Sequence, residues 1–237
     1  MVGGLDWFRP KTPPLVGVDI SSSSVKVLEL SETSKGQYRV ERYAIEPLPR
    51  EAVVDGNIAN LDAAAEVLQR AWRRSGSRIK NVAMALPSAL VITKKVVVPA
   101  GQREEDLELQ VESEANQYIP FALDEVNLDF QVLGPAPSGP EECEVLIAAS
   151  RKDKVEDRVA VAQAAGLKAT IMDVESLAAL SAMEMIEPQL PGGGKNQLIT
   201  LVDIGASIMR VAMLTNGQVV YTREQQVGGN QLTQDIQ

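Results

Sequence analysis

The sequence predicts an α/β fold with two similar parts: a first domain with the element order β-β-β-α-β-α-β-α, and an incomplete second domain that starts again with β-β-β. Short apolar runs alternate with helix-like stretches over residues 15–87 and 151–189, as is typical of α/β domains. A strand, a turn of small residues and another strand occur near the start of each part. The Pro- and Gly-rich segment 190–196 marks the boundary, and the second part occupies residues 190–237. Residues 88–150 carry a β-α-β-β pattern, which we interpret as a small inserted subdomain.

Composition excludes several classes of protein. The 237 residues are 45% hydrophobic, enough for a sizeable core, and the net charge of −9 argues against nucleic acid, which binds through clustered Lys and Arg. The sequence has no histidine, so Ser-His-Asp and Cys-His catalysis and imidazole zinc sites are excluded. Its single cysteine, Cys143, cannot form an internal disulfide. No apolar run approaches the roughly 20 residues of a membrane span, and no signal peptide is recognisable, so we expect a cytoplasmic protein.

The N-terminal tail, residues 1–14, is rich in Gly and Pro but also carries Trp7 and Phe8. These two aromatic residues either pack against the body of the protein or make a weak contact with a membrane or partner. Strands are expected at 15–20 and 24–30. Alternation of apolar and polar residues over 38–44 predicts a third strand, which completes a meander.

The first helix is expected over residues 60–74, because its apolar residues recur at helical spacing and Gly76 is placed to end it. These residues are Leu61, Ala64, Ala65, Leu68, Ala71 and Trp72. Residues 81–86 are apolar and are followed by Pro87, which predicts a strand that stops there.

The insert begins with a strand predicted at 89–99 and a helix predicted at 104–119. The helix starts with acidic residues, as the helix dipole favours. Two further strands are expected at 126–133 and 143–149, joined by a Pro- and Gly-rich turn over 134–142.

The first domain then resumes with a helix at 153–165, a strand at 168–173 and a helix at 174–187. After the linker, the second part has three predicted strands, near 198–204, 208–214 and 218–225. Gly228 and Gly229 are expected to open a further helix.

Two similar stretches carry the chemistry: residues 15–30, called here the first hairpin, and residues 198–214, the second hairpin. In each, an aspartate ends an apolar strand and a basic residue follows seven positions later, which makes Lys26 equivalent to Arg210. Two aspartates facing a triphosphate would repel it unless a divalent cation lay between them. The pairing of Asp19 with Asp203 therefore predicts Mg²⁺, held through water.

The turns that follow the aspartates suit phosphate oxygens, because small residues let backbone N–H groups approach closely. The turn residues are Ser21, Ser22, Ser23 and Ser24 in the first hairpin, and Gly205, Ala206 and Ser207 in the second. Lys26 would add a positive charge. Glu175, at the start of a predicted helix, either orients a water or the ion, as a catalytic residue, or complements the helix dipole, and both roles stay open.

Two glycine-rich segments have different interpretations. Gly228 and Gly229 precede a helix and would let its backbone approach a nucleotide, unless they form a plain loop. Residues 192–195 (GGGK) resemble a Walker loop, but no strand precedes them and no Ser or Thr follows the lysine, so we interpret them as a linker.

These motifs resemble the actin-like ATPase superfamily, which has a ribonuclease H-like fold. The matching segments are Val18–Lys26 and Val202–Ser207 for its two phosphate motifs, Asp173–Ala179 for its first connecting motif, and Gly228–Thr233 for the loop and helix that follow. Within it the sequence resembles the FtsA/PilM branch, and the PilM family of type IV pilus assembly proteins in particular. The segments that carry this closer resemblance are Gly17–Leu30, Asn116–Phe121, Asp124–Phe130 and Tyr221–Glu224.

The resemblance implies an ATP- and Mg²⁺-binding cytoplasmic scaffold with slow or no ATPase activity. It would grip the N-terminal cytoplasmic tail of the inner-membrane protein PilN in a groove beside the insert, contact the pilus assembly motor or platform proteins, and reach the membrane only through partners. Tyr118, Ile119 and Phe121 are candidates for that groove, although packing is expected for at least two of them.

Two other functions stay open. One is a nucleotide-independent scaffold of a secretion, pilus or FtsA-like assembly; the other, less favoured, is a small-molecule kinase, for which the insert offers no recognisable catalytic carboxylate. The second part stops after three strands and lacks the family's adenosine motif, so we expect a partial chain.

Overall fold

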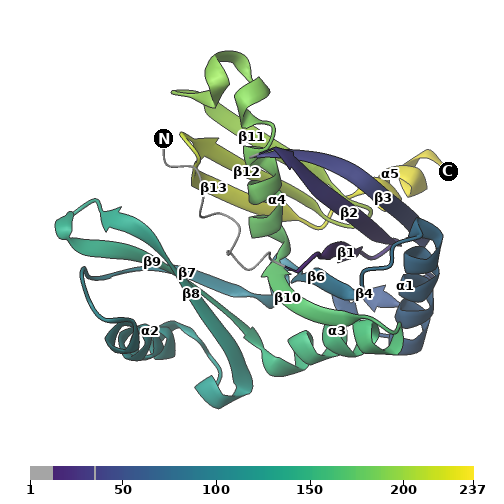
Figure 1. Ribbon diagram of the computed structural model, residues 1–237, viewed down its shortest axis with the longest axis horizontal. Helices are drawn as coiled ribbons and strands as arrows, with labels where there is room; N and C mark the ends of the chain where they lie inside the picture. The colour runs from purple at the N-terminus through teal and green to yellow at the C-terminus, as the bar shows by residue number, and fades with distance from the viewer. Residues whose placement is uncertain (1–12, 35) are drawn as a thin grey trace, which may run out of the picture.

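The computed structural model describes residues 13–34 and 36–237, so the expected contacts of Trp7 and Phe8 lie outside the described residues. The first domain is built on a five-stranded sheet with the order β10-β6-β1-β2-β3 (Figure 1). Its strands are β1 (Val16–Ile20), β2 (Ser24–Ser34), β3 (Gln37–Pro47), β6 (Asn81–Leu86) and β10 (Lys168–Val174). The first three form the predicted antiparallel meander, and β6 and β10 add in parallel to β1.

Two helices, α1 (Leu61–Ser75) and α3 (Lys152–Ala164), pack against this sheet and build its core. The helix α1 begins where the side chain of Asn60 accepts a hydrogen bond from the Ala63 N–H, at 3.0 Å. It ends at Gly76, whose φ of 71° is the left-handed conformation that glycine adopts without strain. Both ends therefore lie within one or two residues of the predicted ones.

The insert forms a separate antiparallel sheet with the order β7-β9-β8 and its own small core. Its elements are β7 (Ile92–Pro99), α2 (Glu104–Tyr118), β8 (Val126–Ala136) and β9 (Gly139–Arg151). The predicted turn over 134–142 is wrong in extent: Pro135 pairs with Cys143 and Ala136 with Gly139. Register shifts near Gly134 and Pro135 let the strands continue past residues that usually interrupt them.

Short segments account for the other differences. The strand expected from residue 89 begins at Ile92, because Ser88–Leu90 form a 3-10 turn. A short hairpin pairs two strands of two residues each, β4 (Val53–Val54) and β5 (Asn57–Ile58). The sequence does not predict it, since strands this short carry no periodicity. The helix α4 (Glu175–Glu184) ends three residues earlier than expected, and 3-10 turns follow at Glu187–Gln189 and Pro191–Gly194.

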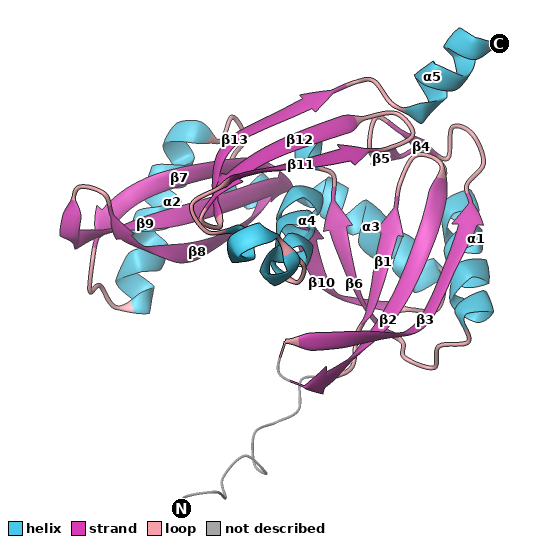
Figure 2. Ribbon diagram, turned by 90° about the horizontal axis from the view of Figure 1, so that it is seen from above, coloured by secondary structure: helices cyan, strands magenta, loops and turns pink. Residues whose placement is uncertain are grey.

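The second part consists of three antiparallel strands and a terminal helix. Its elements are β11 (Leu198–Ile204), β12 (Met209–Thr215), β13 (Gln218–Gln225) and α5 (Gly229–Ile236). The helix α4 leads from the end of β10 toward this second sheet (Figures 1 and 2). Across residues 13–34 and 36–237, no helix is both long and apolar enough to span a membrane.

Candidate functional site

The two hairpins fold with the same register. Asp19 lies opposite Lys26 across β1 and β2, and Asp203 lies opposite Arg210 across β11 and β12. The turns also match: the Ser21 N–H donates to the Ser24 carbonyl at 3.0 Å, and the Gly205 N–H donates to the Ile208 carbonyl at 2.9 Å. The equivalence of Lys26 and Arg210 that the sequence predicts therefore holds in the structure.

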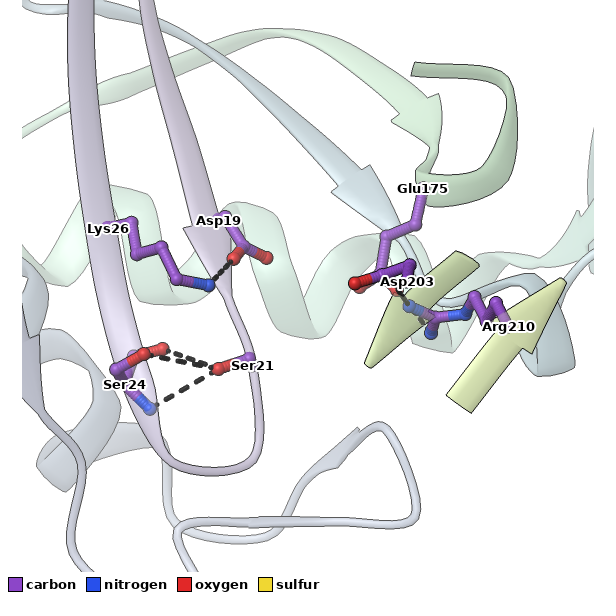
Figure 3. A network of polar contacts seen from close by, with 7 residues as sticks. All are labelled: Asp19, Ser21, Ser24, Lys26, Glu175, Asp203 and Arg210. Atoms are coloured by element: carbon purple, nitrogen blue, oxygen red, sulfur yellow. Dashed lines mark hydrogen bonds and ion pairs between the residues drawn. The ribbon is translucent and has the colours of Figure 1, made fainter. Parts of the chain in front are cut away.

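In the first hairpin, the charged pair is self-contained. Lys26 Nζ donates to Asp19 Oδ2 at 2.5 Å, with both side chains about half exposed. The hydroxyl of Ser21 donates to the Ser24 carbonyl at 3.0 Å and also accepts from the Ser24 N–H at 3.3 Å (Figure 3). The carboxylate of Asp19 is thus balanced by its own neighbour, and the serine turn is closed by its own side chains.

In the second hairpin, the basic residue binds three carboxylates. Arg210 donates through Nη2 to Glu175 at 2.6 Å, through Nε to Glu224 at 2.8 Å and through Nη1 to Asp203 at 3.5 Å. Burial would lower the pKa of Arg210, but these carboxylates outweigh burial and raise it above its usual value. Arg210 is therefore a fixed cation whose three kinds of nitrogen are all engaged.

Glu175 is the first residue of α4, so its charge does complement the helix dipole, and it also faces the second hairpin (Figure 3). Burial raises the pKa of Glu175 above its usual value, and the negative charge of Asp19 adds to this rise. The positive charges of Arg210 and Arg158 oppose it but do not cancel it. A role for Glu175 in orienting a water stays a prediction.

Arg158 was missed by the sequence reasoning. It lies on α3, is 1% exposed and donates through Nη2 to the Gly56 carbonyl at 3.0 Å. Burial lowers the pKa of Arg158, while the charges of Glu175 and Asp19 oppose that change. A signal was present, because Arg158 precedes the buried Val161 and Ala162 by three and four positions and so shares their helix face.

The glycines before α5 make a close backbone contact with the second turn. A Cβ on Gly228 would lie 2.5 Å from the Ala206 carbonyl oxygen, a distance that no side chain tolerates. The Gly229 and Asn230 N–H groups donate to the Gly205 and Ala206 carbonyls at 3.0 and 2.8 Å. The glycine pair thus fixes α5 onto this turn; its approach to a nucleotide stays a prediction.

The two turns meet through their hydroxyls, since Ser22 Oγ lies 3.1 Å from Ser207 Oγ. A phosphate chain bridging the hairpins would meet hydroxyls and small-residue backbone from both sides. Within the described part of the chain, no three Asp, Glu or Cys side chains cluster as a metal site. That donor set still fits Mg²⁺, which commonly binds through one or two carboxylates, phosphate oxygens and water.

The three candidate groove residues differ in exposure. Ile119 is 7% exposed and belongs to the core of the insert, and Phe121 packs against that core, with the Arg151 guanidinium 5.5 Å from its ring centre. Tyr118 is 45% exposed, with Lys94 Nζ 4.6 Å from its ring centre. Two of the three therefore pack, as expected, and Tyr118 is the one that presents a large surface.

Comparison with known proteins indicates the family and the fold of this chain. The family model described as "Type IV pilus assembly protein PilM" matches residues 17–237. The solved "PilM-PilN type IV pilus biogenesis complex" is similar with a TM-score of 0.80 and 26% identity, over 96% of this chain and 65% of that one. The cytoplasmic domain of EpsL, a type II secretion component of Vibrio cholerae, shares the fold at a TM-score of 0.52 and 15% identity, over 90% of this chain and 71% of that one.

Curated relatives include the cell division protein FtsA. The Streptococcus pneumoniae protein is 27% identical over 93% of this chain and 51% of its own length. The Bacillus subtilis protein is 26% identical over 94% of this chain and 48% of its own length. This chain thus spans about half the length of these relatives, and within that half it has the mixed α/β, actin-like fold.

Proposed function

Because the chain belongs to the PilM family of type IV pilus assembly proteins, whose actin-like fold is related to that of FtsA, we propose that it is a cytoplasmic ATP-binding scaffold. It would act in the inner-membrane platform of the pilus, with slow or no ATP turnover. The observation that carries this proposal is the repeated hairpin: two aspartates at the same register, with small-residue turns whose hydroxyls lie 3.1 Å apart.

The phosphates would lie between the two turns. The N–H and hydroxyl groups of Ser22 and Ser207 would donate to phosphate oxygens, and Lys26 would exchange part of its contact with Asp19 for them. When bound, Mg²⁺ neutralises phosphate charge, and Asp19 and Asp203 would hold it through water. Each aspartate already has a basic partner, so binding requires rearrangement of both ion pairs.

Titration calorimetry with ATP tests this role. We expect binding in the presence of Mg²⁺ and weaker binding in EDTA, and we expect Asp19→Ala and Asp203→Ala each to weaken it at least tenfold. As a matched control, Asp62→Ala, on the exposed side of α1, should bind as the unaltered protein does. Undiminished affinity in both site variants would contradict the proposal.

The proposed partner is the N-terminal tail of PilN, because the similar solved structure is a PilM–PilN complex. We propose that the tail binds beside the insert, where Tyr118 is exposed at the end of α2. A labelled tail peptide should bind this chain, and Tyr118→Ala should bind it more weakly. Absence of binding with ATP and Mg²⁺ present would remove PilN as a partner of this chain.

A second candidate is a scaffold that works without nucleotide. One observation favours it: each aspartate already has a basic partner without a ligand, Lys26 for Asp19 and Arg210 for Asp203. The two functions separate cleanly, because a nucleotide-independent scaffold would bind the PilN peptide equally well with and without ATP. Nucleotide that co-purifies with the protein would exclude this second candidate.

A further inference from the structure

Few polar contacts join the second part to the first domain. Within residues 13–34 and 36–237, two side-chain contacts connect residues 198–237 to the first domain. One is the hydroxyl contact of Ser22 with Ser207, at 3.1 Å. The other is the ion pair of Arg210 with Glu175, at 2.6 Å, and it carries the only full charges that meet across this boundary in the described residues.

The geometry of that ion pair is fixed from both sides. Asp203 and Glu224 hold the Arg210 guanidinium within the second sheet, so little side-chain freedom is lost when it meets Glu175. Glu175 is the first residue of α4, which follows directly from β10 of the large sheet. Only 24% of the Arg210 side chain and 18% of the Glu175 side chain are exposed, which limits screening by water and salt.

Among the residues that the structure describes, the equivalent residue in the first hairpin, Lys26, makes no such connection. Lys26 contacts Asp19 on the neighbouring strand, and both belong to the same sheet. A lysine would offer a single ammonium, whereas the planar guanidinium of arginine donates in several directions at once. Arginine at position 210 therefore satisfies its own hairpin and still reaches α4.

We propose that Arg210 is a positioning residue that latches the second part onto the first domain: its ion pair with Glu175 sets the distance between the two hairpins, with or without a nucleotide between them. The latch does not depend on the proposed ATP binding. A merely structural Arg210 would instead stabilise its own sheet and leave the spacing of the two parts unchanged.

Double electron–electron resonance measures that spacing. Spin labels at Glu66→Cys, on the exposed side of α1, and at Gln218→Cys, the exposed first residue of β13, report it in a Cys143→Ala background that removes the native thiol. We expect Arg210→Gln and Glu175→Gln each to shift the distance distribution to longer values. The fraction of molecules with the longer distance should rise about tenfold, the scale expected for loss of a charge-assisted hydrogen bond.

Two comparisons separate a latch from general damage. The double variant Arg210→Gln/Glu175→Gln should open no further than either single variant, because both remove the same contact. Glu224→Gln, which alters a partner of Arg210 inside the second sheet, should leave the distances unchanged. If Arg210→Gln fails to fold, Glu175→Gln carries the test, since it leaves Arg210 paired with two carboxylates.

Unchanged distances in Glu175→Gln would overturn the proposal, and so would additive opening in the double variant. The distances are measured without nucleotide, so their result does not depend on whether the protein binds ATP. Failure of the latch and failure of the proposed ATP binding can therefore be told apart.

Discussion

The two hairpins share a backbone design but differ in their surroundings. The first is part of a five-stranded sheet covered by α1 and α3, with Val16, Val25 and Val27 at 0–1% exposure. The second lies in a three-stranded sheet in which Leu214 is the buried hydrophobic residue. The same spacing of aspartate and basic residue therefore gives one register in both, while neighbouring elements decide what each basic residue does.

This difference indicates how stability is distributed. The first hairpin is held by apolar packing, which does not depend on its charges. The second is held largely by directional contacts: the ion pairs of Arg210 and the backbone contact of Gly228 with Ala206. Replacing charged or polar residues should therefore destabilise the second hairpin more than the first.

The largest expected effect comes from glycine substitutions. Gly228→Ala places a Cβ 2.5 Å from the Ala206 carbonyl oxygen, whereas Gly17→Ala places one at an ordinary 3.7 Å from the Leu28 carbonyl oxygen. Because forced overlap with backbone strains a packed contact, we expect Gly228→Ala to destabilise the second part by about 3 kcal/mol and Gly17→Ala to change stability by less than about 1 kcal/mol. Hydrogen exchange of amides in β11–β13 measures the first effect, and urea unfolding measures the second.

Equal tolerance of the two glycine variants would mean that α5 is not fixed onto the second turn. Ala206→Gly is a suitable control, because it keeps the carbonyl that Gly228 approaches and adds no atoms. It should leave the exchange rates of α5 close to those of the unaltered protein.

The next effect concerns the two basic residues. Arg210→Gln leaves three carboxylates without their cation, and we expect it to cost about 2 kcal/mol, the range for charge-assisted hydrogen bonds. Lys26→Gln removes one exposed pair, for which about 0.5 kcal/mol is typical. Thermal unfolding followed by circular dichroism compares the two variants, and an equal or larger loss in Lys26→Gln would contradict the distinction between the hairpins.

Much of the fold follows from local signals. Periodicity predicts the meander and α1, whose ends are marked by Asn60 and Gly76, and the repeated aspartate spacing predicts the matching registers. These features depend on residues close together in sequence. The turn over 134–142 was overestimated because Gly and Pro usually interrupt strands, while here register shifts absorb them.

The contacts across the site follow less directly from sequence. The hydroxyl contact between Ser22 and Ser207 and the pair of Arg210 with Glu175 join segments far apart in the chain, so no local pattern encodes them. Arg158 is the instructive case, because its helix face was readable but a charged residue on that face is normally taken as solvated. Its buried position depends on the carbonyl of Gly56, supplied by a hairpin too short to predict.

The smallest expected effect is on the pH dependence of the free energy of unfolding. It comes from Glu175, which pairs with Arg210 of the second hairpin. Burial raises the pKa of Glu175 above the unfolded value of 4.5, so the folded protein binds this proton more tightly than the unfolded chain does. Stability from this group is fully present below pH 4.5 and is lost as pH rises through the raised value. Glu175→Gln cannot titrate, so its free energy of unfolding should fall less with rising pH over that window.

Urea unfolding from ~pH 4 to ~pH 7 measures this slope, with Glu66→Gln, on the exposed side of α1, as the control that should keep the slope of the unaltered protein. A slope that steepens in Glu175→Gln would mean that the ion pair with Arg210 outweighs burial and lowers the pKa of this carboxyl. The second hairpin would then stabilise the protein most at neutral pH, and the contact with Arg210 would be a source of stability as well as of position.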